Sequence, residues 1–217
     1  MKDTIKEELH FASPIWLHYK PEWVKTLNKA ANVHVKNTRI TNKSLIRQTK
    51  DFGIIHHSGP LQGDPNFKVL LDYVVNQSWG FLKKQGYNLE SRVPVVADFW
   101  VQEACKNGGA HQHIHVHPNS HVSGFYFLKA SPMTSQPVFF DPRPTAAMSK
   151  LPVVLNRDTN PSNIQVSYQC NPGALIVFNS FLPHAFTVDP GKEPFRFIHW
   201  NVQAVHKDLV QGRAPTI

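Results

Sequence analysis

The sequence predicts a mainly β fold of the α+β class, a β-sandwich or jelly roll with N-terminal helices packed on one face. Two observations support this prediction. The first ninety residues contain two segments with helical spacing, and the residues from about 93 onward form short β-rich runs separated by turns. The chain has 217 residues, of which 41% are hydrophobic, enough for one domain with a packed core.

The two predicted helices lie within residues 21–30 and 64–86. The first starts at Pro21, where a helix tolerates proline. The second starts at Asp64-Pro65, which provides a cap and a proline at the first helical position, and Gly86 can close it. Its apolar residues form one face that needs a sheet to cover: Phe67, Leu70, Leu71, Val74, Val75 and Leu82.

About seven strands are predicted after the helices, with no helix between them: 93–101, 122–128, 137–140, 164–168, 174–178, 184–188 and 195–205. Residues 142–163 fit neither periodicity, so we expect either a lid over the substrate or a plain surface excursion. The predicted organisation is a single domain, residues 1–217. It has a helical part at 1–90, a β core at 91–206 and a tail at 207–217.

The net charge of +8 permits an anionic partner. Basic and aromatic residues are not interleaved, so solvation explains the charge better than a nucleic-acid groove does, although nucleic acid stays open as a partner. Two cysteines cannot form a disulfide framework, and no stretch is apolar enough for a signal peptide or a membrane span. We therefore expect a cytoplasmic protein without membrane association, and the oligomeric state stays open.

A histidine-rich stretch is the strongest functional signal. His111, His113, His115 and His117 alternate along one segment, and His184 follows much later in Pro183-His184. On an extended strand, residues i and i+2 share a face, so two of these imidazoles and a distant third can hold one face of a metal ion. The pair is either His115 with His117 or His113 with His115. A single histidine of this kind could be a surface residue that binds metal by chance, or a histidine that is hydrogen-bonded on its own. Four imidazoles on one face are explained better by a specific metal site.

Several segments resemble a small subfamily of 2-oxoglutarate-Fe(II) oxygenases found in bacteria and phages. The likeness covers about residues 60 to 204, and the segments that carry it are residues 100–128, with His115-Val116-His117-Pro118-Asn119-Ser120, and residues 139–143, 171–184 and 196–201. The resemblance implies a double-stranded β-helix with Fe(II) held by His115, His117 and His184. It also implies that Arg196 pairs with the distal carboxylate of 2-oxoglutarate, for which a guanidinium offers a planar fork.

The implied activity is that of an Fe(II)- and 2-oxoglutarate-dependent dioxygenase that hydroxylates a C–H bond of an unknown small-molecule or peptide substrate. Two departures from the wider superfamily matter. His117 stands where an Asp or Glu is usual, and Asp141 could supply a carboxylate from a neighbouring strand. Ile198 stands where a hydroxyl residue often follows the Arg, so Tyr126 is the candidate that helps to hold the co-substrate.

Two rival functions remain at this point. One is a cupin-type metal enzyme on a similar barrel, because Gly109 precedes His115 and His117 at the spacing of the first cupin motif. No Glu follows at the expected place, and the spacing from Gly173 to His184 does not suit the second motif. The other is a non-catalytic, metal-stabilised binding or structural protein, for which a closed zinc site would be the sign.

Overall fold

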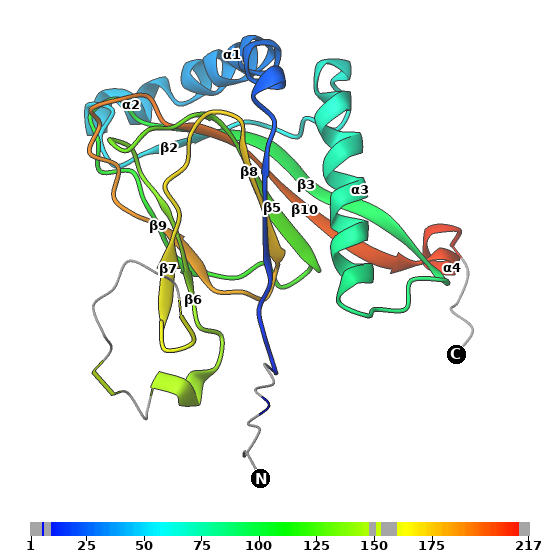
Figure 1. Cartoon of the computed structure of the whole chain (residues 1–217). Coiled ribbons are helices and arrows are strands. Elements are labelled where there is room, and N and C mark those ends of the chain that lie inside the picture. Colours follow the sequence, from blue (N-terminus) through cyan, green and yellow to red (C-terminus); the bar gives the residue numbers. More distant parts are fainter. Residues whose placement is uncertain (1–5, 7–9, 148–150, 153–159, 213–217) are drawn as a thin grey trace.

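Two antiparallel sheets face each other in the computed structural model, which describes residues 6, 10–147, 151–152 and 160–212 (Figure 1). The larger sheet has the strand order β1-β8-β5-β10-β3-β2, and the smaller has the order β4-β9-β6-β7. The predicted class, a mainly β jelly roll with N-terminal helices, is confirmed.

The larger sheet consists of β1 (Ile15–Tyr19), β2 (Ile55–His57), β3 (Arg92–Ala104), β5 (Val122–Lys129), β8 (Ala174–Asn179) and β10 (Arg196–His206). The smaller consists of β4 (Gln112–His115), β6 (Pro137–Phe140), β7 (Gln165–Ser167) and β9 (His184–Phe186). The strands β1 and β2 were not expected from the sequence. They come from the segment predicted to be helical and form the two edges of the larger sheet.

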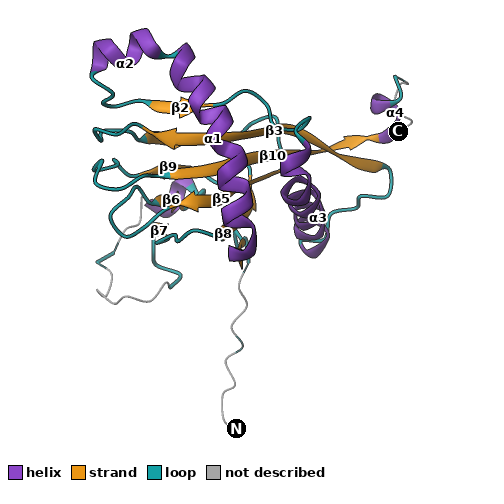
Figure 2. Cartoon of the chain, turned by 90° about the horizontal axis from the view of Figure 1, so that it is seen from above, coloured by secondary structure: helices purple, strands orange, loops and turns teal. Residues whose placement is uncertain are grey.

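Helices cover the outer face of the larger sheet. Those that pack on it are α1 (Val24–Thr41) and α3 (Lys68–Lys84). The helix α2 (Lys43–Thr49) continues from α1, and the short α4 (Lys207–Val210) follows the end of β10. The first predicted helix therefore runs further than expected. The second begins as predicted, with the Asp64 side chain accepting a hydrogen bond from the Asn66 backbone N–H. Figure 2 shows α1 lying across the strands of the larger sheet.

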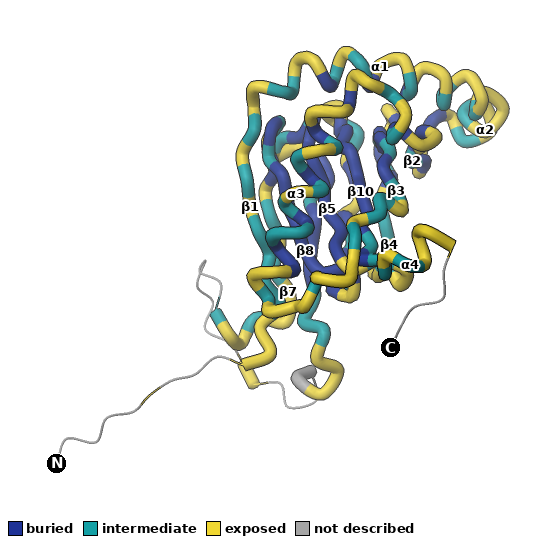
Figure 3. The backbone as a smooth tube through the Cα atoms, turned by 90° about the vertical axis from the view of Figure 1, so that its right-hand side faces the viewer, coloured by how far each residue is buried: buried dark blue, intermediate teal, exposed yellow. Residues whose placement is uncertain are grey.

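The larger sheet separates two hydrophobic clusters. Tyr126, Ile198 and Trp200 point to the outer face, where they pack with residues of α1 and α3. Phe125 and Phe197, their neighbours along β5 and β10, point between the two sheets. Alternation along each strand thus supplies both clusters, and the strands behind α3 are buried along most of their length (Figure 3). The inner cluster consists largely of phenylalanines and fills the barrel below its mouth.

Two glycine-containing turns pack against each other before β4 and after β9. Gly108 and Gly191 both have positive φ, +77° and +69°. A Cβ on Gly191 would lie 2.4 Å from the backbone nitrogen of Gly108, so only glycine permits this approach. The contact lies where the chain enters β4 and leaves β9, the two strands that contain His115 and His184.

Among the described residues, no helix combines the length and apolar composition needed to cross a membrane. Both cysteines are buried and unpaired by disulfide, as the sequence led us to expect.

Candidate metal centre

Three histidines converge at the mouth of the barrel. His115, His117 and His184 each offer one ring nitrogen, and these nitrogens all lie within 4.8 Å of one another. His184 is fully buried, while His115 and His117 are partly exposed. The Nε2 atoms of His117 and His184 are 3.3 Å apart.

Strand pairing brings these residues together from distant parts of the chain. His115 ends β4 and lies opposite His184, the first residue of β9. The backbone N–H of His117 donates to the carbonyl of Ser180, in the turn that leads to β9, at 2.9 Å. Both strands therefore end at the same rim of the barrel, and a short loop on each side orients its side chain.

Backbone carbonyls fix the tautomers of two of the three rings. Nδ1 of His115 lies 2.7 Å from the carbonyl oxygen of His113, and Nδ1 of His184 lies 2.9 Å from that of Leu182. A carbonyl oxygen only accepts, so each Nδ1 carries the proton and each Nε2 keeps its lone pair for a metal. This is the outer partner that metal-binding histidines usually have.

His117 has a different outer partner. Its Nδ1 lies 3.3 Å from Nδ2 of Asn201. The amide orientation of Asn201 is set because Nδ2 also donates to Asp98 at 2.7 Å and Oδ1 accepts from Ser123. In this arrangement Nδ1 of His117 accepts and its Nε2 carries the proton. Coordination through Nε2 would therefore require that proton to leave, Nδ1 to become protonated and the Asn201 amide to turn.

Burial keeps the distal ligand neutral. Desolvation, assisted by the charges of His115 and His117, lowers the pKa of His184 to about 3, against a raising effect of the Leu182 carbonyl. Desolvation and His115 lower the pKa of His117 to about 4, and the negative charge of Asp98 opposes that shift. Both rings are therefore unprotonated at neutral pH, the form in which imidazole binds metals.

A fourth histidine, His199, lines the same space. Its ring centroid is 4.8 Å from that of His117 and 5.1 Å from that of Trp100. Nδ1 of His199 donates to the Gly124 carbonyl at 3.2 Å, while its Nε2 and the Nε1 of Trp100 are buried without a partner. Sequence reasoning missed His199, Asn201 and Asp98. Alternation along β10 and β3 could have indicated them once the inner face was known.

The other histidines of the rich stretch lie apart from this group. His111 and His113 are exposed and pack against each other, with ring centroids 4.7 Å apart. A register shift between Gln112 and His115 breaks the alternation that would have placed four imidazoles in one row. The geometry thus favours the pair His115 and His117 over the pair His113 and His115.

Arg196 does not reach the histidines in this structure. It lies on the outer face of β10 and is 3% exposed, with Nε donating to Glu103 at 2.7 Å. Its Nη1 donates to the side chains of Asn28 and Asn32 in α1, each at 2.7 Å. It alternates along β10 with the inward-facing positions 197, 199 and 201, so its side chain points to the opposite face. The predicted pairing with 2-oxoglutarate therefore does not fit this geometry.

Tyr126 is likewise on the outer face. Its hydroxyl donates to the carbonyl of Lys20 at 2.7 Å, and its ring lies 6.3 Å from that of Trp23. Burial raises the pKa of Tyr126 well above its usual value, so the phenol stays protonated. It belongs to the core beneath the helices, which was the alternative to its predicted role as a co-substrate ligand.

Asp141 is engaged elsewhere and is not part of the histidine group. Its carboxylate accepts from Nε and Nη2 of Arg143 at 2.9 and 2.7 Å. The carboxylate considered as a further metal ligand thus forms an ion pair at the start of the 143–163 segment. Residues 148–150 and 153–159 of that segment lie outside the described residues, so the expected loop is described only at its two ends.

The donor set fits a first-row divalent metal. Two imidazoles present an unprotonated Nε2, the third does so after a tautomer change, and imidazole nitrogen suits iron and zinc alike. Among the described residues the group contains these three donors and no fourth, so a bound ion would keep positions open for other ligands.

Comparison with known proteins agrees with this arrangement. A family model described as "Putative 2OG-Fe(II) oxygenase" matches residues 98–196, which span β3 to the start of β10 and include all three histidines. No curated protein matches the sequence significantly.

Solved structures share the fold. A prolyl-4-hydroxylase from Pseudomonas putida aligns over 87% of this chain and 88% of its own, with 15% identity and a TM-score of 0.52. AviO1 from Streptomyces viridochromogenes aligns over 87% and 90%, with 13% identity and a TM-score of 0.56. SnoN, an α-ketoglutarate-dependent epimerase from nogalamycin biosynthesis, aligns over 88% and 78%, with 9% identity and a TM-score of 0.58.

Proposed function

We propose that this chain hydroxylates a C–H bond of its substrate. The family match and the fold identify it as a 2OG-Fe(II) oxygenase and so as an oxidoreductase. Its cofactors are those of the family, Fe(II) and the co-substrate 2-oxoglutarate. The observation that carries the proposal is the convergence of His115, His117 and His184 at the barrel mouth. Bound there, iron would activate dioxygen while 2-oxoglutarate is oxidised to succinate and CO2.

Each histidine would have a distinct task. His115 and His184 would donate Nε2 to the metal, each held in the required tautomer by a backbone carbonyl. His117 would be oriented by Asn201, with the carboxylate of Asp98 behind it. Because Asp98 is the acidic residue whose charge acts on His117, it would partly offset the positive charge of an all-histidine site.

The open donor set speaks against a purely structural metal. Structural zinc sites are usually closed by four protein ligands, whereas catalytic sites keep a position for substrate. Within the described residues, the group whose ligand atoms lie within 4.8 Å of one another contains three histidines and no fourth member. The non-catalytic alternative is therefore less well supported than the oxygenase.

The distal carboxylate of 2-oxoglutarate needs a donor on the inner face, where Arg196 does not lie. The indole N–H of Trp100 is buried without a partner, and its ring adjoins that of His199 next to His117. We therefore assign Trp100, in place of Arg196, as a hydrogen-bond donor to that carboxylate.

Titration of 2-oxoglutarate into zinc-loaded protein tests the Trp100 assignment. Trp100→Phe removes the N–H together with the five-membered ring of the indole, so we expect at least about tenfold weaker binding; the loss of one hydrogen bond to a charged group is worth about 1.5–3 kcal/mol. Zinc affinity should stay unchanged. An unaltered dissociation constant for 2-oxoglutarate would remove Trp100 from the site.

Labelled dioxygen tests the oxygenase reaction itself. Protein supplied with Fe(II), ascorbate, 2-oxoglutarate and a small-molecule extract should incorporate one 18O atom into succinate and one into a hydroxylated product. Label in succinate alone would mean uncoupled turnover. Label in neither, under conditions in which iron is bound, would contradict the proposed function. Since SnoN is an epimerase of this fold, a product with inverted stereochemistry and no added label would replace hydroxylation by epimerisation.

A further inference from the structure

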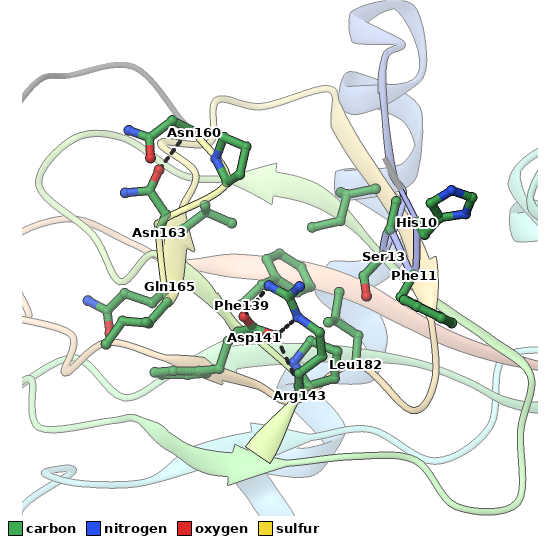
Figure 4. Close-up of a pocket in the computed structure, with 17 residues that line it drawn as sticks. His10, Phe11, Ser13, Phe139, Asp141, Arg143, Asn160, Asn163, Gln165 and Leu182 are labelled. Atoms are coloured by element: carbon green, nitrogen blue, oxygen red, sulfur yellow. Dashed lines mark hydrogen bonds and ion pairs between the residues drawn. The ribbon is translucent and has the colours of Figure 1, made fainter. Parts of the chain in front are cut away.

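We infer that the substrate is a small, largely apolar molecule with a hydrogen-bond-accepting oxygen, and that it binds in the pocket shown in Figure 4. This inference rests on the proposed function for the reaction, but the pocket and its chemistry stand on their own. The pocket has a volume of about 400 Å³. That volume lies within the usual range of small-molecule sites, about 300–1,000 Å³.

The pocket is not lined by any of the three histidines, but two of its lining residues adjoin the distal one. Its wall includes Leu182, whose carbonyl accepts the Nδ1 proton of His184, and Phe139, whose ring centroid is 6.0 Å from that of His184. Phe139 and His184 are also partners in the pairing of β6 with β9. A second cavity, beneath α1, is lined by Glu103 and Arg196 on the outer face of the larger sheet and has no such connection to the histidines.

The edges of the two sheets frame the opening. The start of β1 pairs with the end of β8, as Ile15 lies opposite Phe178, so the segment before β1 reaches the same rim as the histidines. Asp141, just after β6, donates its backbone N–H to the carbonyl of Ile164 at 2.9 Å, just before β7. In Figure 4, His10, Phe11 and Ser13 stand on one side of the pocket, and Asn160, Asn163 and Gln165 stand on the other.

The lining favours an apolar ligand. Most of the lining residues have aromatic, aliphatic or proline side chains, and amides lie at one side. The apolar lining residues are Phe11, Ala12, Ile15, Phe139, Phe140, Pro142, Pro161, Ile164, Val166 and Leu182. Removing an apolar body from water against these groups would supply most of the binding free energy. A highly charged ligand would lose its hydration there without a matching set of charges.

The charged groups at the pocket cancel each other. Arg143 and Asp141 form a two-point ion pair, and Asp141 also accepts the backbone N–H of Arg143 at 2.9 Å. The pair has no net charge, yet it leaves N–H groups of Nη1 and Nη2 of Arg143 without a partner among the described residues. These N–H groups would donate to a carbonyl, ether or hydroxyl oxygen of the substrate, and this sets the polar end of the proposed ligand.

Phe11 is the residue best placed to close over such a ligand. It lines the pocket but is 90% exposed, and its backbone has φ of +60°, a conformation uncommon for a bulky residue. Strained backbone at a ligand site is a recognised sign of function when an observed outlier is present. Packing of the ring on an apolar substrate would bury surface that is otherwise in water.

Two matched probes test the ligand class without any need for catalysis. N-acetylphenylalanine amide carries an apolar ring and carbonyl oxygens, while N-acetylasparagine amide has the same backbone, the same zero charge and a polar side chain. NMR titrations of the zinc-loaded protein would follow the Arg143 Nε–H and the backbone amides of Asp141 and Ile164. We expect saturable shifts with the first probe and at least tenfold weaker binding of the second.

Variants of pocket residues test whether the probe binds in this pocket. Arg143→Gln and Phe11→Ala should each weaken the binding of N-acetylphenylalanine amide at least threefold, whereas Tyr87→Ala, at an exposed residue after α3, should leave it unchanged. Thermal unfolding of each variant shows whether the fold is retained. Equal binding of both probes, or shifts confined to residues beneath α1, would overturn the inference. Binding only of an extended hexapeptide with a central Phe would replace the small molecule by a peptide substrate.

The outcome is separable from that of the proposed function. Probe binding in this pocket without consumption of 2-oxoglutarate would contradict the oxygenase and leave the pocket assignment standing. Consumption of 2-oxoglutarate with no probe binding in this pocket would support the oxygenase and contradict the pocket assignment.

Discussion

His117 differs from the other two proposed ligands in the group that holds its outer nitrogen. His115 and His184 each donate to a backbone carbonyl, whose position is fixed by the fold. His117 instead faces the amide of Asn201, which Asp98 and Ser123 orient. Side-chain partners can move, so the affinity of the site for metal depends on these three residues more than on any backbone group.

Asp98→Asn tests this dependence at the scale of one atom. The change keeps the shape of the side chain and removes the negative charge that acts on His117 and would partly offset the charge of a bound metal. We expect metal affinity to fall about 10- to 100-fold, the range for loss of an outer-sphere partner. Zinc titration with a competing chelator measures it, and Asp72→Asn on the exposed side of α3 serves as control. Equal affinity of both variants would contradict the role given to Asp98.

The lowered pKa of His184 predicts a pH-dependent stability of the metal-free protein. The folded pKa of about 3 lies below the unfolded value of about 6.5, so the unfolded chain binds more protons in this range. The stability from burying the neutral ring is therefore present above pH 6.5 and is lost as pH falls towards 3. Between pH 7 and pH 5 the loss should be about 2 kcal/mol for this residue.

Urea unfolding in EDTA at both pH values measures this loss. His184→Leu lacks the titrating group, so its free energy of unfolding should fall about 2 kcal/mol less than that of the natural protein over the same pH range. His111→Asn, at an exposed residue, is the control. An identical pH dependence for His184→Leu and the natural protein would show that the ring is not held neutral by burial.

At the scale of elements, Arg196 connects α1 to the larger sheet. Its guanidinium joins Asn28 and Asn32 of α1 to Glu103 of β3, and Glu103 also accepts from Arg39 at 3.2 Å. Arg196 and Glu103 are buried at the centre of this network, whereas Asn28 and Arg39 are partly exposed and Asn32 is exposed. Arg196 thus contributes to the attachment of the N-terminal helix, and its loss would remove the close donor of the buried Oε2 of Glu103.

Arg196→Ala should therefore destabilise the fold by about 3 kcal/mol, at the low end of the range for a broken buried ion pair, because Glu103 retains Arg39. The binding of 2-oxoglutarate to folded, zinc-loaded variant should change less than threefold. Urea unfolding and calorimetric titration give the two quantities, with Lys36→Ala on the exposed side of α1 as control. A variant of full stability with 100-fold weaker 2-oxoglutarate binding would restore Arg196 as the anchor.

The elements show where sequence reasoning succeeds and where it stops. The helix from Asp64 and the later strands follow from periodicity and turn residues, because these signals are local. The edge strands β1 and β2 are short and owe their pairing to distant partners, which no local pattern reports. Arg196 points to the outer face because it alternates along β10 with Phe197, which points between the sheets, and the sequence alone does not show which residues of β10 face inward.

The candidate site was predictable in part, because only some of its residues are marked by local sequence signals. His115 and His117 share a strand end, and His184 stands out by its distance from the others and by the preceding Pro183. The outer partners Asp98 and Asn201 come from two other strands, and only the assembled sheet brings them to His117. Tyr126 was misplaced because its strand is buried on both faces, so its apolar neighbours do not reveal which way it points.

At the scale of the whole molecule, the two faces of the larger sheet have separate tasks. The outer face, covered by α1 and α3, contains the large apolar cluster and the Arg196 network, and it stabilises the fold. The inner face and the rims of the two sheets carry the histidines and the substrate pocket. The chemistry is therefore placed where two sheets meet, at the ends of strands that the core holds rigid.

Metal-dependent turnover of 2-oxoglutarate tests this account most directly. Anaerobically iron-loaded protein, given 2-oxoglutarate, ascorbate and then oxygen, should form succinate even without its substrate, at the slow uncoupled rate. His184→Ala should reduce the rate at least about 100-fold, since loss of a ligand should cost no less than loss of an outer partner, while His111→Ala should not change it. Iron content and thermal unfolding of each variant are measured alongside. Succinate formation by folded His184→Ala at the natural rate, or none by iron-loaded natural protein with or without extract, would contradict the account.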